Sequence, residues 1–265
     1  MTSHWDYQAA QWHLIAPPLR PCSDDIVNYE AIISNIAAER STNLLGILLG
    51  VTPEITCMNW PAHTRLIAVE QSEAMIQHHW HSRDSFQCVQ GNWFDLPSAD
   101  NQLDFIIGDG CFTTLDSSNK YTLLLTEIHR ALKPGGLFVQ RFFINRPIAE
   151  SLAEVKGFPD ANFQIFKWRI AMSLQLSIQQ GVALKDIWQA IETFKQEHPL
   201  YASCFPTWTK EIVSTTEVYR NSSACYTFPT LIEITDMADR LFTRVSIKIG
   251  SYPFAERCPI LVYRK

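Results

Sequence analysis

The chain has 265 residues, of which 22 are basic and 27 acidic, and its formal net charge is −5. No run of Lys and Arg is long enough to form the footprint of a nucleic acid or of an anionic membrane, so we expect neither partner. The seven cysteines are odd in number and never spaced C-x-x-C, which indicates neither a disulfide framework nor a zinc cluster.

The N-terminal segment 1–42 is predicted to be an aromatic arm followed by a helix. It lacks the basic and apolar blocks of a signal peptide, and no apolar run in the chain reaches about 18 residues, so we expect a soluble, cytoplasmic protein. The proline-rich stretch 17–21 excludes regular helix, and Ser23 then begins a helix that extends to about Arg40. The arm either packs on the core or forms a lid over the active site.

A strand predicted at 45–49 is short, continuous and apolar, as central parallel strands are. It ends at Gly50, and Thr52, Pro53 and Glu54 then supply an N-cap residue, a proline and a carboxylate for the start of a helix. A strand, a tight turn and a capped helix are the outline of a cofactor-binding crossover. Only one glycine of a G-x-G-x-x-G dinucleotide fingerprint is present.

A second buried strand, 65–70, ends in Glu70, about twenty residues after Gly50, where such folds place the acceptor of the ribose hydroxyls. A helix over 72–81 follows, and its three histidines resemble metal ligands. Two histidines three residues apart on an exposed helix do not make a ligand set without a carboxylate or cysteine partner beside them, so we predict no metal site.

Three further strands are predicted, at 86–90, 103–108 and 137–143, with a helix over 117–132 before the last of them. Polar residues follow the ends of the first two of these strands, in the segment 91–97 and at Asp109-Gly110. Strands that alternate with helices imply a parallel, doubly wound sheet with right-handed crossovers.

The alternation stops after residue 146. Residues 147–227 contain helical patterns without strong strands and form a predicted helical insertion. An amphipathic helix over 229–241 follows, and strands at 243–249 and 259–263 are joined by a short connection that suits an antiparallel pair at the sheet edge. We therefore predict a Rossmann-like core from 43–146 and 228–265, with an insertion that is either a cap over the acceptor pocket or a homodimer interface.

With these elements placed, the chain resembles the class I S-adenosylmethionine-dependent methyltransferases. The likeness lies in the segments 47–52, 69–72, 91–97, 104–109 and 127–136, and the Leu-Lys-Pro-Gly-Gly that ends the last of them is the most specific. The resemblance implies a seven-stranded, mostly parallel sheet with an antiparallel final strand. It also implies S-adenosylmethionine as the cofactor.

The first motif of that family differs in this chain. The family has an acid within the first strand and then G-x-G-x-G, whereas Leu48 stands in the place of the acid, and Thr52 and Glu54 replace the second and third glycines. Because the methyl donor carries a positive amine, Glu54 either takes over the work of the missing acid or only begins the helix.

The resemblance assigns roles to eleven cofactor-binding positions. The turn and Glu54 would serve the methionine part, Glu70 the ribose, the residues at 71, 75, 92 and 93 the adenine, and the last two positions the junction of cofactor and substrate. These positions are Gly50, Val51, Thr52, Glu54, Glu70, Gln71, Met75, Asn92, Trp93, Asp109 and Gly110.

The sequence thus predicts methyl transfer to a small-molecule acceptor by in-line displacement. Positioning can supply much of the rate of such a reaction, so no catalytic residue is assigned. A non-catalytic ligand-binding or partner protein of the same fold is the main alternative, and a nicotinamide-dependent dehydrogenase is another. The absence of a G-x-S-x-G motif disfavours nucleophilic catalysis.

Overall fold

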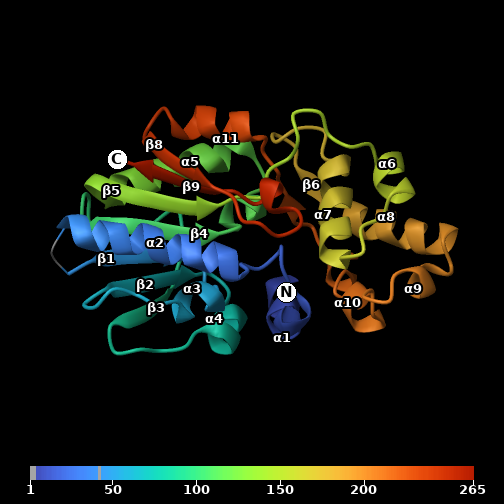
Figure 1. Ribbon diagram of the computed structural model, residues 1–265, viewed down its shortest axis with the longest axis horizontal. Coiled ribbons are helices and arrows are strands. Elements are labelled where there is room, and N and C mark those ends of the chain that lie inside the picture. Colours follow the sequence, from blue (N-terminus) through green and yellow to red (C-terminus); the bar gives the residue numbers. More distant parts are fainter. Residues whose placement is uncertain (1–3, 41–42) are drawn as a thin grey trace.

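A computed structural model describes residues 4–40 and 43–265 of the chain. Figure 1 shows a twisted sheet with helices on both faces and a lobe of helices beyond one end of it. The predicted fold class is confirmed. Five residues of the predicted N-terminal segment, 1–3 and 41–42, lie outside the described part of the chain.

The seven-stranded sheet has the order β3-β2-β1-β4-β5-β9-β8. The first five strands along the chain pair in parallel, and β9 pairs antiparallel with both β5 and β8. The strands are β1 (Leu45–Leu49), β2 (Arg65–Glu70), β3 (Phe86–Gln90), β4 (Leu103–Asp109), β5 (Leu132–Arg141), β8 (Thr243–Lys248) and β9 (Ile260–Arg264). The carboxyl ends of β1, β2 and β4 consequently meet at one edge of the sheet.

The central strands are buried on both faces because successive side chains point to opposite sides. Ile47 and Leu49 of β1 pack in one hydrophobic cluster with α5 (Ser118–Ala131) and α11 (Leu231–Ala238). Leu48 packs in a second cluster, on the other face, which is covered by α2, α3 and α4. These three helices are α2 (Ser23–Arg40), α3 (Pro53–Cys57) and α4 (Glu73–His79). No helix in the described ranges is both long enough and apolar enough to span a membrane.

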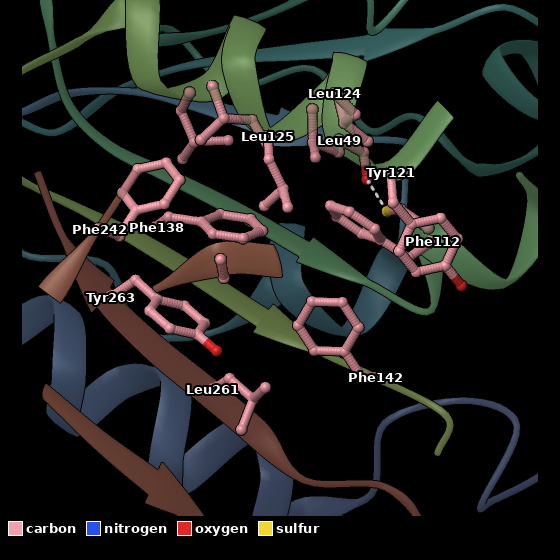
Figure 2. Packing of buried hydrophobic residues seen from close by; sticks show 14 of the residues in the cluster. Leu49, Phe112, Tyr121, Leu124, Leu125, Phe138, Phe142, Phe242, Leu261 and Tyr263 are labelled. Carbon is pink, nitrogen blue, oxygen red and sulfur yellow. Dashed lines mark hydrogen bonds between the residues drawn. The ribbon is translucent and has the colours of Figure 1, made fainter. Parts of the chain in front are cut away.

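Aromatic rings fix the turn that follows β4. Phe112 lies in the short helix η2 (Cys111–Thr114), and its ring is 4.9 Å from that of Phe142 and 5.0 Å from that of Tyr121 (Figure 2). The thiol of Cys111 donates to the carbonyl oxygen of Leu49 at 3.3 Å. The ends of β1 and β4 are thereby tied together.

The Leu-Lys-Pro-Gly-Gly segment corrects one predicted boundary. We expected a helix to residue 132 and a strand from 137, but α5 ends at Ala131 and β5 begins at Leu132. Two sets of contacts explain the difference. Leu132 pairs with Leu103 of β4. The N–H of Gly135 donates to the carbonyl of Lys265, whose own N–H donates to the carbonyl of Gly136. The strand is therefore extended by partners from two other parts of the chain.

The inserted residues form helices with an aromatic core of their own. The ring of Phe166 lies 4.7 Å from that of Trp208 and 4.9 Å from that of Phe194. The elements are α6 (Leu152–Gly157), α7 (Phe163–Leu174), α8 (Leu184–Glu197), α9 (Tyr201–Cys204), α10 (Lys210–Ser214) and η3 (Glu217–Tyr219). A two-residue antiparallel ladder between β6 (Val182–Ala183) and β7 (Cys225–Tyr226) was not predicted, since two residues show no periodicity.

A buried ionic cluster joins the sheet to the N-terminal arm. Arg141, at the end of β5, is fully buried and donates from Nε and Nη2 to the two carboxylate oxygens of Asp109, at 2.5 and 3.2 Å. Its Nη1 donates to the carbonyl of Pro18 at 2.8 Å and lies 3.5 Å from the carboxylate of Asp25 on α2. The hydroxyl of Tyr252 also donates to Asp25, at 3.0 Å. Two carboxylates therefore compensate one buried guanidinium.

Replacing Arg141 by methionine should lower the free energy of unfolding by about 3–5 kcal/mol, because two buried carboxylates lose their cation. Urea unfolding followed by circular dichroism measures this. Arg264→Met is the control: its pair with Glu39, at 3.4 Å, is on the surface, where such a change costs about 0.5 kcal/mol or less. If both variants lost the same free energy of unfolding, the buried cluster would contribute no more to stability than a surface ion pair.

Candidate functional site

A cavity of about 620 Å³ lies at the carboxyl ends of the central strands. This volume is within the range of small-molecule sites, roughly 300–1,000 Å³. The sheet edge forms one wall, the inserted helices another, and the N-terminal helix α1 (His4–Gln11) a third. Of the eleven predicted cofactor-binding residues, all but Glu54 line it. Their roles toward a cofactor stay predictions.

Gly50 and Glu70 meet at one end of the cavity. Gly50 has φ +87°, a conformation that favours glycine, and a Cβ built on it would lie 3.6 Å from Oε2 of Glu70. The other carboxylate oxygen of Glu70 accepts from the N–H of Ser72 at 2.8 Å. Burial raises the pKa of Glu70, and backbone N–H groups of Ser72 and Gln71 oppose this rise. The carboxylate is thus held in place with one oxygen directed to the turn.

The side chains that follow β2 and β3 form the adjoining wall. The indole N–H of Trp93 donates to the carbonyl of Val69 at 2.7 Å, which fixes the ring beside Gly50. Asn92 uses its side-chain oxygen to accept from the N–H of Phe94 at 3.0 Å. Met75 is buried below them on α4. The ring of Trp93 is therefore a fixed, flat surface on this wall of the cavity.

Asp109 and Gly110 lie where β4 meets the insertion. The carboxylate of Asp109 pairs with Arg141 and does not cap the following turn, whose N-cap is Gly110. Burial raises the pKa of Asp109, and the guanidinium opposes that rise. Gly110 has φ +63°, and a Cβ there would lie 2.8 Å from the ring of Phe143. This position accordingly requires glycine.

Glu54 is directed to the arm and does not reach the cavity wall. Nε of Arg20 donates to Oε1 of Glu54 at 2.7 Å, while Nη1 of Arg20 donates to the carbonyls of Trp12 and Ile15. The other oxygen of Glu54 is buried without a hydrogen-bond partner. Thr52 holds the N-cap position of α3, but its hydroxyl makes no capping hydrogen bond. Glu54 therefore secures the arm through Arg20.

The N-terminal arm both packs on the core and lines the cavity, so the two alternatives for it are combined. Trp5 and Trp12 line the cavity. Nε2 of His79 lies 3.0 Å from the carbonyl of Ala9, and its ring is 5.2 Å from that of Trp12. One of the histidines that resembled metal ligands thus holds the arm against α4.

The inserted helices contribute residues that the sequence did not assign. Lys167, Trp168, Tyr219 and Tyr226 line the cavity, and the ring of Trp168 stands edge-on to that of Phe143 at 5.5 Å. The available signal was a lysine within the apolar run of α7, which reads FQIFKWRIAM from residue 163. Whether this lysine lines a cavity or faces solvent depends on where α7 packs, which the sequence pattern does not show.

Comparison with known proteins tests the resemblance. The family described as "Methyltransferase domain" matches residues 49–140. The resemblance to the class I methyltransferases is confirmed. This matched methyltransferase domain contains ten of the cavity-lining positions named from the sequence, from Gly50 to Gly110. No match was found among curated proteins.

Solved structures share the fold at low identity. The N-methyltransferase NodS from Bradyrhizobium japonicum WM9, in complex with S-adenosyl-L-homocysteine, aligns over 98% of each chain with 9% identity and a TM-score of 0.51. A chain from the complex between the Haloferax volcanii Trm112 methyltransferase activator and the putative methyltransferase aligns over 100% of this chain and 98% of its own, with 11% identity and a TM-score of 0.52. At these identities the likeness shows the fold alone.

One similar structure has a different description, putative Zn-dependent alcohol dehydrogenases from Rhodobacter sphaeroides, with 9% identity, coverage of 100% and 98%, and a TM-score of 0.55. The strand order separates the two classes. A dinucleotide-binding sheet has the order 3-2-1-4-5-6. Here the antiparallel β9 lies between β5 and β8, as the methyltransferase resemblance implies.

Replacing Glu54 by glutamine tests whether this residue holds the donor's amine. Since Arg20 already pairs with the carboxylate, we expect the affinity for S-adenosylhomocysteine to change less than about threefold and the melting temperature to fall slightly, as for a partly exposed ion pair. Calorimetry and thermal unfolding measure the two quantities. A tenfold or larger loss of affinity would instead assign the role of the missing first-strand acid to Glu54.

Proposed function

We propose that the protein catalyses S-adenosylmethionine-dependent methyl transfer to a small-molecule acceptor. One observation carries this proposal: a single cavity connects the end formed by Gly50 and Glu70 to the end formed by the inserted helices. The matched methyltransferase domain supplies the first end, and residues outside the match supply the second. Donor and acceptor would therefore share one space.

The divergent first motif is compatible with cofactor binding. Gly50 keeps the positive φ of the turn, and Thr52, which replaces the second glycine, has φ −58°, a conformation that does not require glycine. Leu48 is buried in the core and has no access to the cavity. In this proposal Glu70 holds the ribose, and Trp93 and Met75 hold the adenine.

S-adenosylmethionine would supply an electrophilic methyl group at the junction near Gly110. The chain's own contribution is orientation: a rigid turn at Gly110, the ring of Phe143 packed against it, and Trp168 beyond. The arm and the insertion also line the cavity around the junction. Fixed geometry in a largely apolar cavity supplies much of the rate of a direct displacement.

The composition of the insertion favours a small, partly apolar acceptor. Residues 147–227 contain seven basic and eight acidic residues, so this segment has no excess charge to attract a polyanion. Its side chains at the cavity are mainly aromatic. We propose that it is a cap over the acceptor, because Trp168 and Tyr226 line the cavity that Asp109 also lines. A homodimer interface is the alternative role for its outer face.

A non-catalytic ligand-binding protein is the second candidate, and the replacement of the first-strand acid by Leu48 favours it. Calorimetry with S-adenosylmethionine and S-adenosylhomocysteine separates the readings. Binding of both with slow turnover of the methyl donor supports the enzyme. Binding without turnover supports the second candidate, and the lack of binding of both compounds would refute the enzyme.

Glu70→Ala should weaken the binding of S-adenosylhomocysteine at least tenfold, since each charge-assisted hydrogen bond to a hydroxyl contributes about 1.5–3 kcal/mol. Isothermal titration calorimetry measures the loss. Glu39→Ala, a change to an exposed carboxylate on α2, is the control and should bind like the parent. If Glu70→Ala also binds like the parent while it stays folded, the ribose role is wrong.

A further inference from the structure

Lys167 is a buried amine without a partner. It lies on α7, its side chain is 1% exposed, and it lines the cavity. In the described ranges 4–40 and 43–265 its Nζ has neither a hydrogen bond nor an ion pair, and its neighbours are the rings of Trp168 at 5.6 Å and Tyr219 at 5.9 Å. Burying a polar group in this way costs free energy unless a ligand satisfies it.

The groups that face the amine come from three other elements. Tyr219 of η3 and Tyr226 of β7 are hydrogen-bonded to each other, and Gln8 of α1 bonds to Tyr219. Burial raises the pKa of Tyr219 to about 12 and that of Tyr226 well above its usual value, so both are neutral hydroxyls near pH 7. α1 also brings Asp6 to the cavity wall.

Among residues 4–40 and 43–265, no carboxylate forms an ion pair with Lys167 as Asp109 does with Arg141. Burial alone lowers the pKa of Lys167 to about 7. Near neutral pH, the amine of Lys167 is therefore uncharged in a large share of the molecules. An uncharged amine can accept a proton, and it is a cation once it has done so. A lysine that served only as a structural cation would not need to lose its proton near neutral pH.

We propose that Lys167 removes the proton from an acidic hydroxyl of the acceptor and pairs with the resulting oxyanion, so that the acceptor is a small phenol or enol. The inference rests on the proposed function and names its acceptor class. The rings of Phe143, Trp168 and Tyr226 favour a flat acceptor, because they stand edge-on at 5.5 and 5.6 Å around the same part of the cavity. An acidic hydroxyl on a planar carbon framework fits both features.

The step balances with the proposed methyl donor alone. The acceptor O–H bond breaks, its proton joins the lone pair of Nζ, and the oxygen keeps the electron pair. A lone pair of this oxygen then forms the bond to the methyl carbon while the carbon–sulfur bond breaks toward sulfur. The ammonium of Lys167 finally releases its proton to water, so one proton leaves per methyl transferred.

Para-nitrophenol tests the proposal, because its phenolate absorbs visible light and its phenol does not. The intact protein is saturated with S-adenosylhomocysteine and mixed with this probe about one pH unit below the pKa of the free phenol. The parent should increase the phenolate band and lower the apparent pKa of the bound phenol by about one unit, a tenfold shift of the equilibrium. Lys167→Met, which keeps the length and removes the amine, should abolish the increase.

Lys195→Met is the matched control, because Lys195 lies on α8 of the same insertion, does not line the cavity and is paired with Glu192 at 2.6 Å. It should keep the phenolate band. Thermal unfolding of Lys167→Met should show no loss of stability, since an unpartnered buried amine is removed. A missing band in the parent, or an equal band in Lys167→Met, overturns the role of Lys167.

Calorimetry on the same samples separates this inference from the function on which it rests. If S-adenosylhomocysteine binds but the parent produces no phenolate band, only the role of Lys167 and the acceptor class are refuted. If S-adenosylhomocysteine does not bind, the proposed function fails and the inference fails with it.

Discussion

The compensation of one buried guanidinium is the constraint on which the site depends. Arg141 is fully buried, and burial of an unpaired cation would cost several kcal/mol. Its partners come from different parts of the chain: Asp109 from β4, Asp25 from α2, and the carbonyl of Pro18 from the arm. Satisfying Arg141 therefore requires the arm to lie across the end of the sheet, and this placement brings α1 to the cavity.

The same cation sets the geometry of the junction between the two ends of the cavity. The N–H of Gly110 donates to the carbonyl of Arg141 at 2.9 Å, and the guanidinium lies 5.2 Å from the ring of Phe143. That ring occupies the space that any side chain at residue 110 would need. The backbone carbonyl of Arg141 thus orders the turn after β4, and its guanidinium contacts the first residues after β5 and the arm.

The sequence predicted what local patterns determine. Apolar runs placed β1, β2 and β3 within their observed bounds, and polar residues after strand ends identified the cavity wall from Gly50 to Gly110. It did not predict contacts made at long range. Glu54 pairs with Arg20, which is 34 residues away. The Leu-Lys-Pro-Gly-Gly segment becomes strand through contacts with Leu103 and Lys265. In the sequence, Lys167 is one polar residue in an apolar helix, and only the packing of α7 shows that it lines the cavity.

Arg141 and Lys167 are both buried near the cavity, but Arg141 is paired with carboxylates and Lys167 is not. The chemistry of the two side chains is consistent with this difference. Arginine stays charged and forms fixed, bidentate pairs, as Arg141 does with Asp109, whereas a buried lysine readily changes its protonation state. The cavity consequently has a carboxylate, Glu70, at one end and an uncompensated amine, Lys167, at the other. Transfer of a cationic methyl group to an oxyanion reduces the number of charges, and a largely apolar cavity favours such a reaction over the same reaction in water. In the part of the chain that the structure describes, no carboxylate is paired with Lys167. The proposed chemistry requires this, because a permanent counter-ion would keep the lysine protonated.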